Sequence, residues 1–178
     1  AKDITNTGSS MAAGGDASLK AGGNVTFDTI QDKSVDTTHS TFKQGGATGM
    51  TTTTTTTVTQ VKSGLSSGGN LSIDAGKDIT LAGTNTRAAG NADLKAGGDL
   101  NMLARENTTD IHSESKASGF GMNGSLYGST TVTTDSTSVR NVGSTLQVGG
   151  NASLAAGNDI TVQGSSVDVK GSGTVSAT

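Results

Sequence analysis

The feature that most constrains the fold of this chain is an internal repeat with a short spacing of about 21 residues. The segment 69–76 aligns with 90–97, and the segment 77–81 aligns with 98–102. The same offset relates residues 3–5 to 24–26 and residues 150–154 to 171–175. A unit this short cannot bury an apolar face by itself, so successive units are expected to stack into a solenoid.

Each repeat unit divides into three parts. In one unit Leu71, Ile73 and Ala75 alternate with polar residues, and Ile79 and Leu81 do the same after a short Gly-containing break. Such alternation predicts two strands that each turn one side inward. The third part, residues 84–89, is shorter and more polar. The unit therefore predicts an all-β fold, a three-sided parallel β-helix with about 21 residues per coil.

The composition agrees with a narrow solenoid rather than a globular core. Only 30% of the residues are hydrophobic and 2% are aromatic, well below the usual content of a compact domain. Disorder is disfavoured because 15% of the residues are charged, the net charge is only −3, and proline is absent; disordered chains are usually enriched in proline. The chain has no cysteine, which excludes disulfides and cysteine-based chemistry.

A second, longer period of about 75–81 residues is superimposed on the short one. Residues 1–5 recur at 76–80 and again at 157–161. We expect a single β-solenoid segment over residues 1–178. Its first long repeat would cover about 1–75, its second about 76–156, and 157–178 would begin a third.

Two less regular stretches, about 29–66 and 104–146, occupy the same place in each long repeat. Both are rich in Thr and Ser, which favour extended strand, and they contain Gly45-Gly46 and Asn123-Gly124, which are hairpin signals. Each stretch is interpreted as a long β-hairpin arm that leaves the coil, or as an extended arm that lies along the solenoid.

Three of the four aromatic residues, Phe42, Phe120 and Tyr127, lie in these arms. They either pin the arm to the solenoid wall or form a contact surface for a partner. These three residues are the candidate contact surface that the sequence offers.

Other candidate sites have weaker support. Asp78 and Asp99 lie one period apart, so they would stack either as a weak cation site or as two solvated corner residues. His39 and His112 lie in matching places of the two long repeats. They could act as a pH sensor or share a metal, or they could simply be exposed repeat positions. No Gly-x-Ser-x-Gly elbow with a placed His and acid is visible, and the acidic residues recur with the repeat. We therefore expect no catalytic residues, no cofactor, no metal and no enzymatic activity.

Several partner classes are disfavoured by charge and hydropathy. The isoelectric point is about 5.2 and no basic cluster or aromatic platform stands out, so we expect no nucleic-acid partner. No run of 18 apolar residues occurs, as a membrane-spanning helix would need. No signal peptide begins at Ala1, so an export signal is expected outside these residues.

The repeat phrases also carry a family resemblance. They are AGGDL at 96–100, GGNLSIDAG at 68–76 and AGNDITVQGS at 156–165. With the Thr/Ser-rich arm that leads into 142–146, they resemble the haemagglutinin repeat of filamentous-haemagglutinin-like exoproteins, the two-partner secretion proteins of Gram-negative bacteria. The arm-plus-coil pattern is most similar to the second repeat class of contact-dependent growth inhibition toxins and large adhesins. The resemblance implies a right-handed β-helix.

The resemblance also implies a location, partners and a function. It implies a secreted or cell-surface protein that is exported through an outer-membrane two-partner secretion transporter, with the target-cell outer membrane or a receptor as a further partner. The leading expectation is delivery of a C-terminal toxin across the target cell's outer membrane. The alternatives are a stalk segment of an adhesin that mediates attachment and a polysaccharide-acting β-helix enzyme. Exposed strand edges at the ends of a cut solenoid predict end-to-end self-association.

Overall fold

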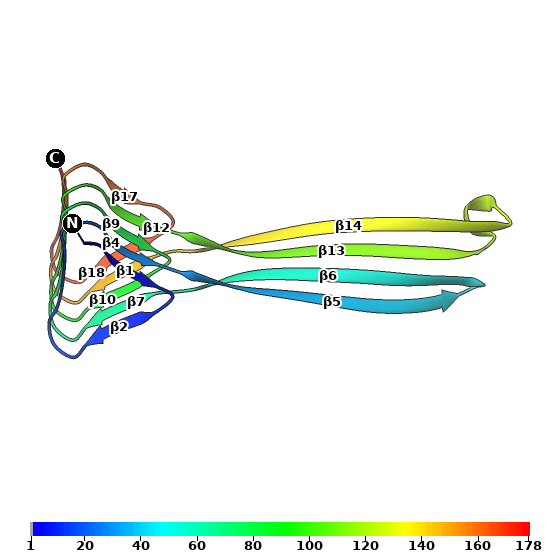
Figure 1. Ribbon diagram of the computed structural model, residues 1–178, viewed down its shortest axis with the longest axis horizontal. Helices are drawn as coiled ribbons and strands as arrows, with labels where there is room; N and C mark the ends of the chain where they lie inside the picture. The colour runs from blue at the N-terminus through cyan, green and yellow to red at the C-terminus, as the bar shows by residue number, and fades with distance from the viewer. Residues whose placement is uncertain (1) are drawn as a thin grey trace. The chain divides into compact units, whose positions relative to one another are not determined.

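The computed structural model of the protein describes residues 2–178. These residues form two compact units. The solenoid unit contains the chain up to Gln31, Gln60–Glu106 and Asn141–Thr178, and the arm unit contains Asp32–Thr59 and Asn107–Arg140. Figure 1 shows stacked coils in the first unit and long strands in the second.

The solenoid unit is built from three parallel sheets of five strands each, so the predicted parallel β-helix is confirmed. Sheet A contains β1 (Ile4–Thr7), β4 (Val25–Asp28), β9 (Ile79–Ala82), β12 (Leu100–Leu103) and β17 (Ile160–Val162). Sheet B contains β2 (Ser10–Ala13), β7 (Gly64–Ser67), β10 (Asn85–Ala88), β15 (Thr145–Val148) and β18 (Ser166–Val169). Sheet C contains β3 (Ala17–Ala21), β8 (Leu71–Ala75), β11 (Ala92–Ala96), β16 (Ala152–Ala156) and β19 (Gly173–Ala177).

One strand from each sheet makes one coil, and the coils are numbered 1 to 5 along the chain. At the corner before sheet A, equivalent residues of successive coils are 21, 54, 21 and 60 residues apart. In sheet B the corresponding separations are 54, 21, 60 and 21 residues. The additional residues of coils 2 and 4 lie between their sheet A strand and their sheet B strand. The proposed boundaries of the long repeats stay a prediction.

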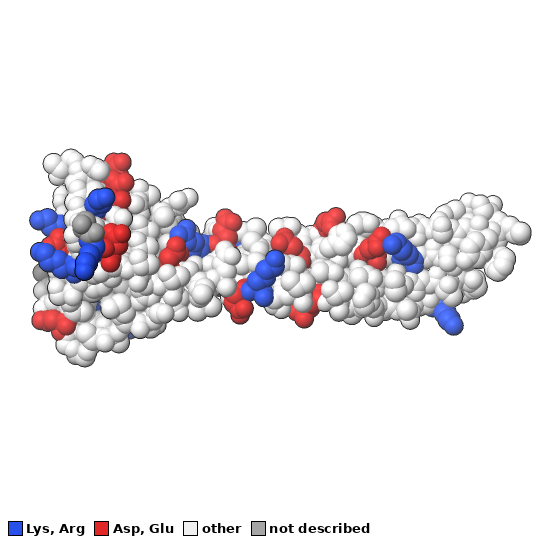
Figure 2. Space-filling model, in the orientation of Figure 1, with Lys and Arg blue, Asp and Glu red and all other residues white. Residues whose placement is uncertain are grey.

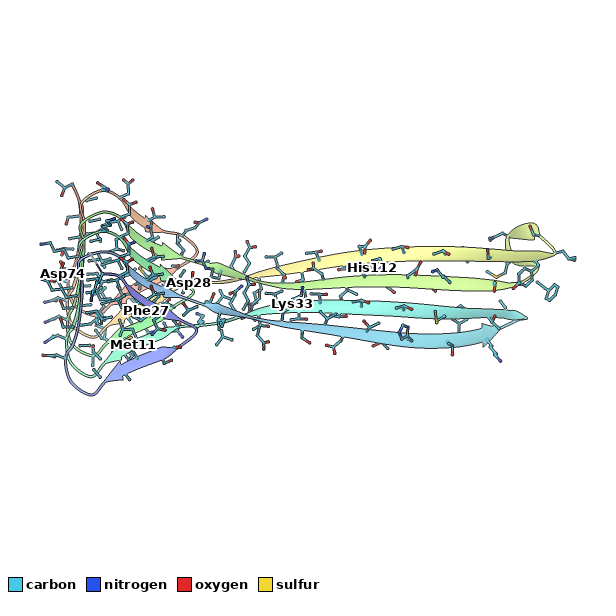
Figure 3. The ribbon with its side chains drawn as sticks, viewed as in Figure 1. Met11, Phe27, Asp28, Lys33, Asp74 and His112 are labelled. Carbon is cyan, nitrogen blue, oxygen red and sulfur yellow. The ribbon has the colours of Figure 1, made fainter. Side chains whose placement is uncertain are left out.

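The core is a set of columns in which equivalent side chains stack from coil to coil. Val25, Ile79 and Leu100 form part of one column and are fully buried. Phe27 pairs with Leu81 in the next column and is fully buried; Figure 3 labels it within the solenoid. The inward side chains predicted from the alternation are all buried: Leu71, Ile73, Ala75, Ile79 and Leu81.

The third side of the coil is more regular than its polar sequence indicates. Residues 85–88 form the full strand β10, in which Thr86 and Ala88 face inward with 1% and 2% exposure. Backbone pairing with β7 and β15 fixes this strand on both sides. Pairing with two neighbouring strands therefore compensates for the weak apolar pattern of this segment.

The corner between sheets A and B differs between alternate coils. In coils 1, 3 and 5 it is a short turn at Gly8, Gly83 and Gly164, whose φ angles of 59°, 56° and 56° are left-handed. Glycine suits this turn because a Cβ would be strained at positive φ. In coils 2 and 4 the same corner is replaced by a long insertion. Coils 1, 3 and 5, which lack an insertion, are called plain coils below.

Both insertions are β-hairpins, as predicted, and together they form the arm sheet. The first hairpin is β5 (Ile30–Gln44) and β6 (Ala47–Val61), and the second is β13 (Arg105–Phe120) and β14 (Tyr127–Val142). The strand order is β14-β13-β6-β5. Gly45 and Gly46 form a two-residue turn with φ of 57° and 81°, as a type I′ hairpin requires. In the second loop, which includes the 3₁₀ turn η1 (Met122–Gly124), Asn123 and Gly124 also have positive φ.

Candidate interaction surface

The acidic residues at the corner before sheet A form a hydrogen-bonded ladder. The backbone N–H of Asp99 donates to Oδ1 of Asp78 at 2.8 Å, and the N–H of Asp159 donates to Oδ1 of Asp99 at 3.2 Å. Each carboxylate therefore accepts a hydrogen bond from the next coil along the stack. These contacts favour the corner interpretation of Asp78 and Asp99 over a cation site, because backbone dipoles already stabilise the negative charge.

A second ladder follows the corner before sheet C. The N–H of Asn91 donates to Oδ1 of Asn70 at 2.9 Å, and the N–H of Asn151 donates to Oδ1 of Asn91 at 2.8 Å. The Asn/Asp-plus-glycine pattern of the repeat indicated turns, but it did not indicate that the side chains bond between coils. Among the described residues no group of three or more His, Cys, Asp or Glu side chains could hold a metal ion.

The two histidines do not lie in matching places in the arm sheet. His112 is opposite Thr54 on β6, and its Nδ1 lies 2.5 Å from Oδ1 of Asp135 on β14. His39 bonds instead to Oγ1 of Thr52 at 3.0 Å. Equivalent positions of β5 and β13 are 75 residues apart, since Phe27 before β5 and Met102 before β13 both pair with Leu81. His39 and His112 are 73 residues apart. The two rings therefore lie two residues out of register. A shared metal or paired switch is therefore not supported.

One of the predicted contact residues packs within its own hairpin. The ring of Phe42 on β5 lies over the cross-strand Gly49 of β6, close enough that a Cβ at position 49 would clash with it. An aromatic ring that covers a strand glycine shields the backbone where no side chain is present. Phe42 is nevertheless 41% exposed.

The other two predicted residues meet at the end of the second hairpin. The rings of Phe120 and Tyr127 pack edge to face, with centroids 5.5 Å apart and an interplanar angle of 81°. Phe120 is 70% exposed, Tyr127 is 61% exposed and Leu126, which the sequence reasoning missed, is 88% exposed. We call Phe120, Leu126 and Tyr127 the apolar tip.

The apolar tip lies within an uncharged part of the chain. Residues 117–134 contain no Asp, Glu, Lys or Arg. This uncharged span was the signal in the sequence that could have identified Leu126. Elsewhere, Figure 2 shows acidic and basic side chains interspersed on the visible face rather than gathered by sign. Exposed apolar side chains without neighbouring charge are typical of a contact surface.

A salt bridge connects the two corners from which the hairpins begin. Arg105 of coil 4 donates from Nε to Oδ1 of Asp28 in coil 2 at 2.8 Å, and from Nη2 to Oδ2 at 2.5 Å. The corner of coil 3 lies between them, and a Cβ at Gly83 would approach Cγ of Arg105 to 3.4 Å. The small corner of the plain coil therefore leaves room for Arg105 to reach across it.

This salt bridge also sets the protonation of Asp28. Partial burial raises the pKa of its carboxyl group, but the hydrogen bonds from Arg105 and from the Thr29 N–H, together with the charge of Arg105, outweigh that effect and lower the pKa below its ordinary value. The hydrogen bond to Asp28 raises the pKa of Arg105. The pair is therefore ionised over the whole neutral range.

Taken together, stacked coils, corner ladders and hairpin insertions define a repetitive β-solenoid protein. The sequence model of the hemagglutinin repeat family matches this chain over residues 45–134 and 127–178. The chain belongs to this family, the haemagglutinin repeat region of filamentous-haemagglutinin-like proteins. No curated protein and no solved structure matches the chain significantly.

Family membership establishes the general character of the protein. It is a structural segment of a large filamentous-haemagglutinin-like exoprotein, of a family that is secreted or located at the cell surface and is associated with two-partner secretion. The hemagglutinin repeat is a structural or adhesin-type repeat rather than an enzymatic one. Within the described residues, no helix is long and apolar enough to cross a membrane.

Proposed function

We propose that this segment helps to deliver a C-terminal toxin across the outer membrane of a target cell in contact-dependent growth inhibition. In this role the solenoid is the scaffold and the apolar tip is the surface that meets the target cell, either its outer membrane or a receptor there. The exoprotein reaches the cell surface through its outer-membrane two-partner secretion transporter, and the family's association with such systems supports this partner.

The observation that carries the proposal is the exposure of the apolar tip. Phe120, Leu126 and Tyr127 are 61% to 88% exposed and lie in the span 117–134, which has no charged side chains. Keeping large apolar groups in water is unfavourable, by about 1.5–3 kcal/mol for a fully exposed side chain relative to a buried one. A surface of this kind gains free energy when a partner covers it.

A second candidate is a stalk segment of a haemagglutinin-type adhesin. The continuity of the stack supports it, since every coil pairs with its neighbours through all three sheets. Such a stack can hold a distant binding domain away from the cell surface. The polysaccharide-acting enzyme receives no comparable support, because Asp78 and Asp99 hold the corners of the coils.

The test compares the intact exoprotein with a variant that lacks this segment, in a co-culture of producer and susceptible cells. Attachment and growth of the susceptible cells are scored separately. If attachment persists but growth inhibition is lost, the segment belongs to the delivery machinery. Loss of attachment itself would reject delivery as the primary role and support the adhesin.

A second comparison addresses the apolar tip alone. The triple variant Phe120→Ser, Leu126→Ser and Tyr127→Ser should lose growth inhibition while the exoprotein is still exported. The matched control replaces three other exposed apolar residues of the arm sheet with Ser: Val35, Val132 and Val139, which are 57%, 56% and 54% exposed. Equal inhibition by the tip variant and the parent would show that the tip makes no essential contact.

A further inference from the structure

The loop that joins β13 to β14 is the outermost part of the arm sheet. Gly119 of β13 is opposite Ala47 of β6, so residues 121–126 continue past the two-residue turn at Gly45 and Gly46. Figure 1 shows this loop beyond the turn that joins β5 to β6. A strand added alongside β14 would pair with its backbone edge, in the plane of the sheet. The projecting loop, and the apolar tip with it, would stay accessible.

The loop also forms hydrogen bonds between its own backbone groups. The N–H of Gly121 donates to the carbonyl of Leu126 at 3.3 Å, and the N–H of Ser125 donates to the carbonyl of Met122 at 3.2 Å. A backbone group that leaves water without a partner is strongly disfavoured in an apolar environment. These internal bonds therefore reduce the cost of moving the loop out of water.

The area of the apolar tip is small for a protein partner. A large side chain offers about 150–250 Å², so Phe120, Leu126 and Tyr127, at 61% to 88% exposure, together present roughly 400 Å². Each partner in a stable protein–protein interface contributes about 800 Å². A lipid surface needs no complementary shape, and binding to it scales with the apolar area buried and with attraction to anionic lipids. The tip therefore suits a lipid surface better than a protein receptor.

A groove of about 620 Å³ crosses the four strands of the arm sheet next to the tip, and Lys43, Lys116 and Ser118 contribute to its lining. Ser118 is two residues from Phe120 on β13, so their side chains lie on one face. The described residues that line the groove include no Asp or Glu, although Nζ of Lys116 lies 3.0 Å from Oε1 of Glu114. Lysines and hydroxyls beside an apolar tip complement the phosphates of lipid headgroups.

We propose that the apolar tip enters the interfacial region of a lipid bilayer, with Lys43 and the hydroxyls of the groove contacting phosphate headgroups. Tyr127 suits this depth because its ring is apolar and its hydroxyl is polar. A charged side chain would oppose entry, and the span 117–134 has none. This inference rests on the proposed function, within which it names lipid rather than a receptor as the partner of the tip.

The fluorescence of Tyr127 tests the proposal on the unmodified chain. Tyr127 is the only tyrosine and the chain has no tryptophan, so the emission comes from the apolar tip. The chain is titrated with vesicles of phosphatidylcholine and phosphatidylglycerol whose acyl chains are either ordinary or brominated, since bromine quenches an aromatic ring that touches it. We expect brominated vesicles to lower the emission severalfold relative to ordinary ones. Equal emission with both kinds of vesicle would overturn the proposal.

A pair of variants assigns the binding to the tip. Phe120→Ser with Leu126→Ser keeps Tyr127 as the reporter and should need severalfold more lipid for the same quenching. The matched control, Val35→Ser with Val139→Ser, also removes exposed apolar side chains from the arm sheet and should behave as the parent does. Both variants should keep the parent's circular dichroism spectrum. Equal lipid binding by the tip variant and the parent would contradict the proposal.

A second pair of variants addresses the headgroup contact. Lys43→Ala should weaken binding to vesicles that contain phosphatidylglycerol and leave binding to pure phosphatidylcholine unchanged, because only the first carry a net negative charge. Lys33→Ala is the control, since Lys33 lies on the same face of β5 but ten residues farther from the turn. An equal loss in the control, or no loss in Lys43→Ala, would reject the role of Lys43.

The co-culture assay separates this inference from the proposed function. If the triple tip variant loses growth inhibition but lipid does not quench Tyr127 in the parent, delivery stands, the tip contacts a receptor and the lipid inference falls. If lipid quenches Tyr127 but the triple tip variant inhibits growth fully, the lipid contact stands and its role in delivery falls.

Discussion

At the residue scale, the narrow interior of the solenoid makes each inward position selective for apolar side chains. Ile79 is fully buried in a column between Val25 and Leu100. Its outward neighbour, Thr80, lies on the same strand with its side chain on the other face. The strand alternation therefore converts a one-residue difference in position into a difference between core and surface.

We expect Ile79→Asp to destabilise the solenoid by about 3 kcal/mol or more, since a buried carboxylate there has no cationic partner in the column. The matched variant Thr80→Asp introduces the same charge on the outer face and should change stability by about 0.5–1 kcal/mol. Thr54→Ala in the arm sheet should likewise have little effect. Urea unfolding followed by circular dichroism measures all three, and an Ile79→Asp midpoint equal to the parent's would contradict the register.

Replacement of Thr86 is expected to raise the free energy of unfolding rather than lower it. Its Oγ1 is buried without a hydrogen-bond partner among the described residues, between Leu65 and Leu146. Thr86→Val removes this unsatisfied hydroxyl and should stabilise the protein by about 1 kcal/mol. The control is Thr84→Val: Oγ1 of Thr84 donates to the carbonyls of Phe27 and Ala82 at 3.2 and 3.1 Å, so its loss should destabilise. Thermal unfolding that moves both variants in the same direction would contradict this account.

At the scale of single elements, the corner between sheets A and B decides where a hairpin can leave the coil. Plain coils turn there on a left-handed glycine, and in coil 3 this small corner lies under the Arg105–Asp28 pair. Side-chain hydroxyls bind the stack at the same place: Oγ of Ser144 donates to the carbonyls of Leu81 and Leu103 at 2.7 and 2.9 Å. The alternation of plain and hairpin-bearing coils therefore has a local physical basis.

The Arg105–Asp28 pair should make stability depend on pH in the acidic range. Because the folded-state pKa of Asp28 is lowered, its stabilisation is present above the unfolded pKa of about 3.9 and is lost as pH falls through the folded value. We expect Asp28→Asn to cost about 1 kcal/mol at pH 7, a modest value because both side chains are partly exposed and water screens them.

The measurement is the difference in unfolding free energy between the parent and Asp28→Asn at pH 7 and at about pH 3. The difference should shrink at the lower pH, where the carboxyl group of Asp28 becomes protonated in the parent. The Lys20–Asp74 contact on sheet C also lowers an aspartate pKa, but it is present in both proteins and cancels. A difference that is independent of pH would show that the charge of Asp28 does not contribute.

At the scale of the whole molecule, the chain combines two kinds of sheet with different sources of stability. The solenoid buries columns of aliphatic side chains. The arm sheet has few buried side chains among its described residues, so its order rests on backbone pairing, β-branched threonine and hydroxyl contacts across strands. The solenoid is therefore expected to fold without the arms.

Removal of both arms tests this expectation. Residues 29–63 would be replaced by Gly-Thr and residues 104–144 by Gly-Ser, the corner dipeptides of the plain coils 3 and 5. Every coil then has the length of a plain coil, and the armless chain should keep a β-type circular dichroism spectrum and unfold in one cooperative transition. An unfolded armless chain would instead assign to the arms a role in holding the solenoid together.

By itself, the sequence determined the local units and their repetition. The short repeat spacing, the alternation of Leu71, Ile73 and Ala75, and the glycine turns of the hairpins are set by strand periodicity and backbone sterics, which act within a few residues. The repeat and turn patterns predicted the solenoid and its hairpins. The repeat phrases at 68–76, 96–100 and 156–165 also predicted the class of protein.

Only the tertiary structure decided which distant residues meet. The two-residue displacement between His39 and His112, the reach of Arg105 to Asp28 and the pairing of β6 with β13 depend on the register between coils and hairpins. Insertions of different length change that register without changing the local sequence pattern. Leu126 joined the apolar tip for a related reason: its 88% exposure depends on what packs around the loop, which no local pattern specifies.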